Sequence, residues 1–215
     1  MTVLSAGVIT ESVPEQATHY YAMDEGSGST LTDAVGSADF TTNGGVTWAS
    51  DSRYTGGVAP SFDGTDDYAQ GSPDLSTPFT VIIRTYTTGL GTSSPYYRSV
   101  LVDDSDNDNA LVYTVGSDEW RVNTPRVDVA DADATGEHIL ALTSGNDQTE
   151  LRVYNGDESL HGSSSASGTM SYAGAVNLAR WTDNSRYWDG ELDTLTIADS
   201  VLSQSEIEDI IAEYY

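Results

Sequence analysis

Residues 187–210, YWDGELDTLTIADSVLSQSEIEDI, contain an expected β-strand followed directly by an expected helix. Residues 194–197 alternate polar and apolar side chains with a period of two, which is typical of a strand with one buried face. Ser203 and Glu206 stand three residues apart, the spacing of a helix capping box. The apolar stripe of the helix would then be Ile207, Ile210 and Ile211. The stretch predicts a strand that passes into a short C-terminal helix.

Similar segments occur upstream, separated by turns rich in Gly, Ser, Asn and Asp. Strands at this spacing, with few helical patterns between them, predict an all-β antiparallel sandwich with a short C-terminal helix. The low-complexity stretch 162–168, GSSSASG, is expected to be a hairpin loop. The expected strands are residues 79–86, 99–102, 111–115, 119–122, 138–143, 150–154, 175–179 and 192–197.

The chain length favours one domain, because 215 residues with 38% apolar content suffice for one sizeable core. Residues 1–18 differ in character, since they are polar and contain Pro14. We expect residues 1–18 to be an N-terminal arm or an added edge strand, and residues 19–215 to be the domain.

Four segments, in order, carry a family resemblance. They are residues 19–28 (HYYAMDEGSG), 57–68 (GVAPSFDGTDDY), 137–160 (EHILALTSGNDQTELRVYNGDESL) and 187–210. Together they resemble the laminin-G-like modules of the concanavalin A-like lectin–glucanase group, over residues 19–211. The sequence departs from that pattern at Glu137, where Trp is usual, and at Asn155, where Asp is frequent. The resemblance implies a jelly-roll β-sandwich.

The charge balance is extreme. Thirty-four Asp and Glu face eight basic residues, all of them arginine, for a formal net charge of −26. Self-repulsion of this size destabilises a compact chain in dilute salt, whereas at about 1 M salt the Debye length falls to ~3 Å. The composition therefore resembles that of haloarchaeal and other salt-adapted proteins.

The same composition excludes several classes of partner and site. Eight scattered arginines form no phosphate-binding patch, so nucleic acid and anionic lipid are not expected partners. The absence of cysteine excludes disulfides and thiolate chemistry. No apolar run reaches the ~18 residues of a membrane helix, and the N-terminal MTVLSAGVIT lacks the basic start of a secretory signal. We expect no membrane insertion.

Glu191, Asp193 and Thr196 bear on the possibility of an enzyme. Some retaining glycosidases of this fold carry Glu-x-Asp-x-x-Glu on one strand, and Glu191 and Asp193 match its first positions. Thr196 stands where the second Glu would be, and this chemistry needs two carboxyl groups. The sequence therefore predicts that the chain is not an enzyme. The alternative, a glycan hydrolase or lyase, would need a carboxylate pair that the sequence does not display.

Asp193 shares one face of its expected strand with Leu195 and Ile197 by the two-residue period. A carboxylate in an apolar row must be hydrogen-bonded or bound to a cation. The laminin-G-like resemblance implies a structural Ca²⁺ between the opening turn and the last strand, held by Asp24, Asp63 and Asp193 with backbone carbonyls. The alternative is that Asp193 caps backbone N–H groups without metal.

Aromatic and polar side chains suited to glycan recognition occur together in residues 181–187 (WTDNSRY) and 96–98 (YYR). For Trp181 and Tyr96, packing against the rest of the domain is as good an interpretation as ligand binding. The candidate ligand-binding residues are Trp181, Asp183, Asn184, Arg186, Tyr96, Tyr97 and Trp120.

Together these features predict a non-catalytic binding module that works in high salt. We expect a virion component, such as a capsid decoration, a turret or a tail-fibre head, located on a virion or an extracellular surface. Its expected partners are a surface glycan or glycoprotein for adhesion, or neighbouring virion proteins, with a homo-oligomer left open. A purely structural assembly protein without glycan binding is the alternative.

Overall fold

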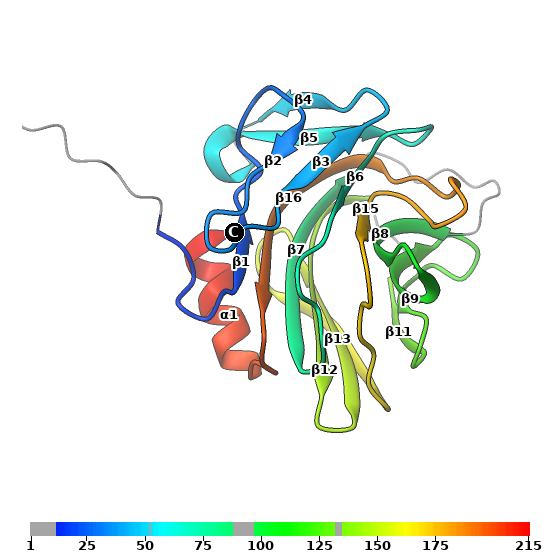
Figure 1. The fold of residues 1–215 in the computed structure, drawn as a ribbon. Coiled ribbons are helices and arrows are strands. Elements are labelled where there is room, and N and C mark those ends of the chain that lie inside the picture. Colours follow the sequence, from blue (N-terminus) through cyan, green and yellow to red (C-terminus); the bar gives the residue numbers. More distant parts are fainter. Residues whose placement is uncertain (1–11, 52, 88–96, 132–134) are drawn as a thin grey trace, which may run out of the picture.

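Two antiparallel β-sheets packed face to face, with a helix on the outer side of one of them, make up the computed structural model (Figure 1). It describes residues 12–51, 53–87, 97–131 and 135–215. The prediction of an all-β antiparallel sandwich with a short C-terminal helix is confirmed. Residues 1–11 of the expected N-terminal arm lie outside the described residues.

The sheet that carries the helix is called sheet A. Its strands follow the order β14 (Leu160–Ser167), β13 (Gln148–Asn155), β12 (Gly136–Gly145), β7 (Phe79–Thr87), β16 (Asp189–Ala198), β5 (Val58–Asp63) and β4 (Thr47–Ser50). The opening strand β1 (His19–Tyr21) pairs with β16. A short 3-10 helix, η1 (Thr55–Gly57), lies between β4 and β5 in the chain.

The opposite sheet is called sheet B. Its strands follow the order β11 (Val127–Ala130), β10 (Glu119–Val122), β9 (Asp106–Thr114), β8 (Tyr97–Asp103), β15 (Val176–Leu178), β6 (Tyr68–Gly71), β3 (Phe40–Asn43) and β2 (Thr30–Leu31). Strands far apart in sequence are neighbours here, as with β15 between β8 and β6.

Each strand expected from the sequence is present, with ends that differ by a few residues. One expectation is wrong. Residues 162–168 do not form a hairpin loop, because most of them lie in β14, which pairs with β13 from Gln148 to Tyr154. Small Ser and Gly side chains can occupy an edge strand, where backbone pairing holds the chain without a buried side-chain face.

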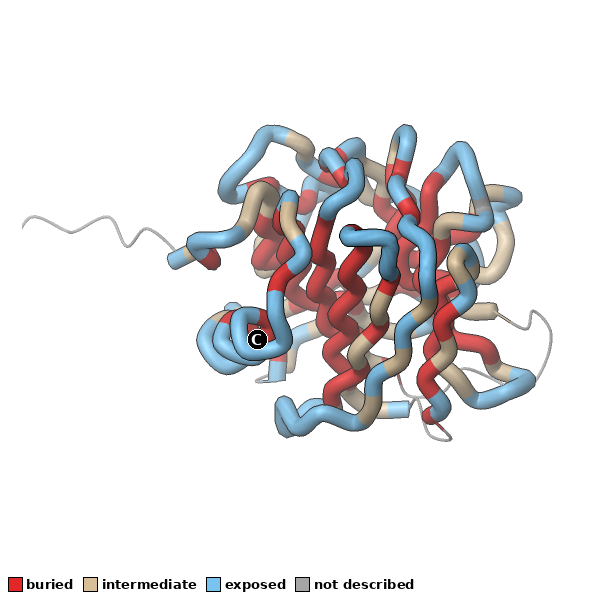
Figure 2. Tube along the Cα trace, turned by 90° about the horizontal axis from the view of Figure 1, so that it is seen from below, coloured by how far each residue is buried: buried red, intermediate tan, exposed pale blue. Residues whose placement is uncertain are grey.

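The inner faces of the two sheets form the main core, and Figure 2 shows the buried residues running along the strands while the connecting loops are exposed. Trp120 and Trp188 are fully buried there, with ring centroids 6.1 Å apart. Trp120 Nε1 donates to Asp131 Oδ2 at 2.9 Å, which satisfies the polar end of the indole.

A bulge in β16 changes the side on which Asp193 lies. The pairing with β7 shifts register between Asp193 and Leu195, and Thr194 has a φ of 40°. Leu192 and Leu195 both belong to the inner core, whereas Asp193 contacts Arg84 on the outer face of sheet A. The expectation that Asp193 shares a face with Leu195 is therefore wrong, because the extra residue interrupts the two-residue period.

Helix α1 (Gln204–Tyr214) covers part of the outer face of sheet A. Its capping box is formed as expected, with Ser203 Oγ accepting from Glu206 N–H and the Glu206 carboxylate accepting from Ser203 N–H at 2.7 Å. The buried isoleucines of the helix pack on side chains of β7, β12, β13 and β16. In Figure 1, α1 lies to the left of β16 and β7 of sheet A, and β15, β8 and β9 of sheet B lie to their right.

Candidate functional site

The outer face of sheet B, turned away from sheet A, carries a second layer of side chains. Leu111 belongs to the inner core, so its neighbours along β9, Ala110 and Val112, point outward. Val102 of β8 joins them, and Trp181 packs on this group from a loop. The sheet therefore supports a small apolar cluster on its outer surface.

Residues 179–188, called the 179–188 loop, connect β15 to β16 across this face. Trp188 N–H donates to Ala179 O at 2.9 Å and closes the base of the loop. Ser99 N–H of β8 donates to Arg186 O at 3.1 Å, which ties the far end of the loop to sheet B. Asn184 and Arg186 have φ values of 56° and 55°, in the left-handed region that non-glycine residues adopt only when their surroundings hold them there.

Three side chains form a stack on this face, called the aromatic–arginine stack. The rings of Trp181 and Tyr97 lie nearly parallel, with an interplanar angle of 11° and centroids 5.9 Å apart. Arg186 Cζ lies 4.7 Å from the centroid of Trp181 and 5.5 Å from that of Tyr97. Arg121 Nη1 of β10 donates to Tyr97 Oη at 3.2 Å. Trp181 is only 5% exposed and Arg121 is buried as well, so the half-buried Arg186 and Tyr97, rather than the indole, face the solvent.

Arg180 fastens the 179–188 loop to sheet B. Its Nη2 lies 3.0 Å from Asp104 Oδ1 and donates to Asn177 Oδ1 at 2.9 Å. Its Nη1 donates to Asn184 Oδ1 at 3.1 Å, and its Cζ lies 3.7 Å from the ring centroid of Tyr68. The sequence analysis did not single out Arg180 or Tyr68, because their partners come from segments far away in the chain.

The structure brings together three of the residues expected to bind a ligand, Trp181, Tyr97 and Arg186. Asn184 lies beside them on the loop, where its N–H donates to Trp181 O at 3.3 Å and its side chain accepts from Arg180. Asp183 is exposed on the same loop and accepts a hydrogen bond from Ser185 Oγ. The 179–188 loop is thus the place where the expected residues converge.

Two expected ligand-binding residues do not join this group. The expectation that Trp120 binds a ligand is wrong. Trp120 is fully buried between the sheets and donates to Asp131, so its ring offers no surface to a ligand. Tyr96 lies outside the described residues.

The three aspartates expected to hold calcium are not brought together. Asp24 lies against Gly56 of η1, next to Thr55, whose N–H donates to Asp193 Oδ2 at 2.9 Å. Asp63 pairs with Asp189, four residues along β16 from Asp193, a separation of ~13 Å for an extended strand.

The surroundings of Asp193 do not fit a calcium ligand either. Its Oδ2 lies 3.7 Å from Arg84 Nη1, and a guanidinium in that position repels a cation. Asp193 is 2% exposed, and this burial raises its pKa to about 6, although Thr55 and Arg84 act in the opposite direction. The observed arrangement corresponds to the metal-free alternative for Asp193, in which the carboxylate accepts a backbone N–H. Calcium itself stays a prediction.

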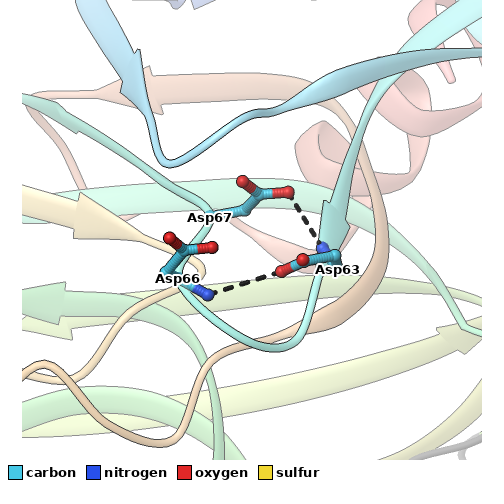
Figure 3. A group of neighbouring side chains, drawn as sticks. All are labelled: Asp63, Asp66 and Asp67. Atoms are coloured by element: carbon cyan, nitrogen blue, oxygen red, sulfur yellow. Dashed lines mark hydrogen bonds between the residues drawn. The ribbon is translucent and has the colours of Figure 1, made fainter.

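Asp63 lies instead with Asp66 and Asp67 in the turn between β5 and β6 (Figure 3). One oxygen of each carboxylate lies within 4.8 Å of the others. Asp66 N–H donates to Asp63 Oδ1 at 3.4 Å, and Asp63 N–H donates to Asp67 Oδ2 at 3.1 Å. Burial, followed by the neighbouring carboxylates, raises the pKa of Asp67, although backbone N–H groups oppose this. The hydrogen bonds account for the shape of the turn without a metal.

A second carboxylate does come near Glu191, from another strand. Glu191 of β16 and Glu137 of β12 are both register partners of Tyr86, on opposite sides of β7. Their Cα atoms are thus about 10 Å apart on one face of sheet A. Glu137 Oε1 lies 3.0 Å from Arg84 Nε, and Glu191 Oε1 accepts from Ser61 Oγ at 3.1 Å. The local motif could not reveal this pair, because its members are far apart in the chain.

Among the described residues, no helix combines the length and the apolar character needed to cross a bilayer. No family model and no curated protein matches the chain. The laminin-G-like resemblance and the salt-adapted interpretation therefore stay predictions.

Solved structures do match the fold. Domain 4 of AbnA, a GH43 extracellular arabinanase from Geobacillus stearothermophilus, in complex with arabinotriose, aligns with a TM-score of 0.60 at 16% identity and covers 91% of this chain and 98% of that one. Trypanosoma rangeli sialidase aligns with a TM-score of 0.59 at 14% identity over 89% of this chain, which spans 32% of the sialidase. A mutant of HCR/D aligns with a TM-score of 0.62 at 11% identity, covering 92% of this chain and 51% of that one.

These neighbours confirm the sandwich fold and correct one expectation. The prediction that the chain is not an enzyme is contradicted, because its fold occurs in a domain of an arabinanase and within sialidases. The missing second Glu of the strand motif is therefore no ground for excluding catalysis.

Proposed function

We propose that the chain binds carbohydrate on the outer face of sheet B, at the aromatic–arginine stack. The observation that carries the proposal is the stack itself, in which Arg186 lies over Trp181 and Tyr97 on a loop fastened to the sheet. Carbohydrate recognition requires hydrogen-bond donors held in place beside apolar surface. The domain bound to arabinotriose in the matched structure shares this fold, which supports the proposal.

The rigidity of the face favours binding. Arg180 and Ser99 each tie the 179–188 loop to sheet B, and Tyr97 belongs to a strand. Side chains that are already ordered lose little conformational entropy when a ligand arrives. Asn177 of β15 is fully buried and accepts from Gln70 Nε2 of β6 at 3.0 Å, so the residue to which Arg180 is bonded is itself held in place.

The setting that we propose is a virion or another extracellular surface in high salt. Its support is the net charge of −26, which is suited to molar salt. The partner would then be a glycan or glycoprotein on a host surface, recognised for adhesion.

The test is a titration of the purified chain with a panel of neutral and acidic oligosaccharides, arabinotriose included, in about 1 M KCl. We expect Trp181→Ala to weaken binding at least ~10-fold, because Tyr97 and Arg186 lose the ring against which they are placed. Trp48→Ala on β4 of sheet A is the matched control and should leave the affinity unchanged. Trp181→Phe replaces the alanine variant if circular dichroism shows that the latter is unfolded.

Equal affinity of the wild type and a folded Trp181 variant would place binding elsewhere and overturn the proposal. Absence of binding to the whole panel would favour the purely structural assembly protein. The release of reducing ends is followed in the same samples, because the fold also occurs in glycan-active enzymes.

A further inference from the structure

Arg186 has no ion pair within the part of the chain that the structure describes, although acidic residues outnumber basic ones by 34 to 8. In six of the other arginines, a nitrogen lies 2.6–3.0 Å from a carboxylate oxygen. Arg98, the remaining one, interacts electrostatically with Asp189. The six paired residues are Arg53, Arg84, Arg121, Arg126, Arg152 and Arg180.

The contrast is clearest within the 179–188 loop itself. Arg180 is 7% exposed and uses its guanidinium on three acceptors of the protein. Arg186 is half-buried, and its guanidinium lies over the rings of Trp181 and Tyr97. Aromatic faces attract the cation but accept no ordinary hydrogen bond from its edge. Five N–H donors are thus held in place without an acceptor among the described residues.

We infer that Arg186 binds the carboxylate of an acidic sugar, such as a hexuronic acid residue, in the proposed carbohydrate site. A carboxylate matches the planar guanidinium with two parallel hydrogen bonds, which are stronger than bonds to neutral hydroxyls. The inference rests on the proposed function, because it names the sugar class for that same site.

The charges around the stack leave Arg186 as the group that can receive an anion. Tyr97, beside Arg186, accepts a hydrogen bond from Arg121, whose own charge is paired with Asp128 at 2.6 Å. The net charge of −26 opposes an anionic ligand at long range in dilute salt. At about 1 M salt the Debye length is ~3 Å, so this repulsion is screened, while direct hydrogen bonds at contact distance persist.

The experiment compares matched probes in about 1 M KCl: galacturonic, glucuronic and mannuronic acid trimers, and the methyl ester of each. Isothermal titration is carried out on the wild type, Arg186→Gln, Arg186→Lys and Arg126→Gln. The last variant is the control, because it removes the same charge from the turn between β10 and β11, at the edge of the same sheet. Arg126 is 61% exposed in its side chain and already pairs with Asp128 at 2.6 Å.

We expect at least one acid trimer to bind ~10-fold more tightly than its ester, a difference of about 1.4 kcal/mol. Arg186→Gln should reduce this preference to within ~2-fold, and Arg186→Lys should retain only part of it, because an ammonium lacks the two-pronged geometry. Arg126→Gln should preserve the preference in full.

Two results would overturn the inference and leave the proposed function intact. One is equal binding of acid and ester that is lost in Trp181→Ala; the other is a preference for the acid that survives in Arg186→Gln. If the wild type binds no trimer but binds a neutral sugar of the earlier panel, the inference also fails. If it binds no saccharide at all, both fail together.

Discussion

At the scale of the residue, Asp193 is a carboxyl group whose titration is dominated by burial. Its carboxylate is 2% exposed and is compensated by Thr55 N–H at 2.9 Å and by Arg84 at 3.7 Å. Burial outweighs these contacts and raises its pKa to about 6. The folded state therefore holds this proton more tightly than the unfolded chain does.

Stability should consequently depend on pH through Asp193. Its contribution is fully present below pH 4, near the ordinary aspartate pKa, and is lost as the pH rises through about 6. A shift of this size corresponds to about 3 kcal/mol in total. Urea unfolding of the wild type and Asp193→Asn at pH 4 and pH 7, at constant ionic strength, should show a fall in stability that is larger in the wild type by about this amount, because other carboxyl groups such as Asp67 titrate in both proteins.

The control for this pH series is Asp108→Asn, because Asp108 is exposed on β9. It should follow the wild type at both pH values. A difference between wild type and Asp193→Asn that does not change with pH would contradict the assigned role of burial.

The packing of Trp181 also leads to a prediction for the free energy of unfolding. Trp181→Ala removes a 5% exposed side chain that packs on Val102 and Val112, and should cost about 3 kcal/mol in the free energy of unfolding. Tyr97→Phe keeps the ring and loses only the bond from Arg121, so it should cost about 1 kcal/mol or less. Urea unfolding curves would measure both. Equal losses would mean that the hydroxyl, and not the stacked rings, holds the loop.

At the scale of the element, α1 depends on its first turn and on its apolar stripe. Ser203 and Glu206 close the capping box, and Ile207, Ile210 and Ile211 are buried against sheet A. A helix of this length is marginal on its own in water, so the packing against the sheet supplies most of its stability.

Ser203→Ala should therefore destabilise the domain by about 1 kcal/mol, because Glu206 N–H loses its acceptor. Thermal unfolding measures the loss, and Ser203→Thr should recover most of it, since threonine retains the hydroxyl. A threonine variant as unstable as the alanine variant would show that the hydroxyl does not act as the cap.

At the scale of the whole molecule, the net charge of −26 is the dominant feature. Ion pairs engage most of the arginines, yet they neutralise only a small part of 34 acidic residues. The remaining repulsion acts over the Debye length, which is ~10 Å at 0.1 M salt.

The thermal midpoint should accordingly rise with KCl between about 0.1 M and 2 M, as screening relieves the repulsion. For a domain of this size, each ~1 kcal/mol of relief raises the midpoint by about 2–4 °C. Sucrose at matched osmolality is the control, because excluded solutes stabilise folded chains without screening charge. A midpoint that is flat in KCl, or that rises equally in sucrose, would contradict the charge argument.

Local patterns were sufficient to predict the sandwich, its main strands and the capped helix. The β-branched and aromatic residues of the stretch 79–86 and the Ser203–Glu206 spacing are properties of a few neighbouring residues, and backbone conformation follows from them. The candidate residues of the 179–188 loop were also found, because aromatic and polar residues are adjacent in its sequence.

The partners of each side chain depended on contacts between distant segments. A bulge at Thr194 turned Asp193 away from the core, because the extra residue interrupts the two-residue period on which the expected face of Asp193 rested. Trp120 became a core residue through its packing against Trp188, 68 positions later in the numbering, while Trp181 came to rest on Tyr97. Strand order and register bring such pairs together. Both depend on the packing of the whole chain, because the same local alternation of side chains is compatible with many strand pairings.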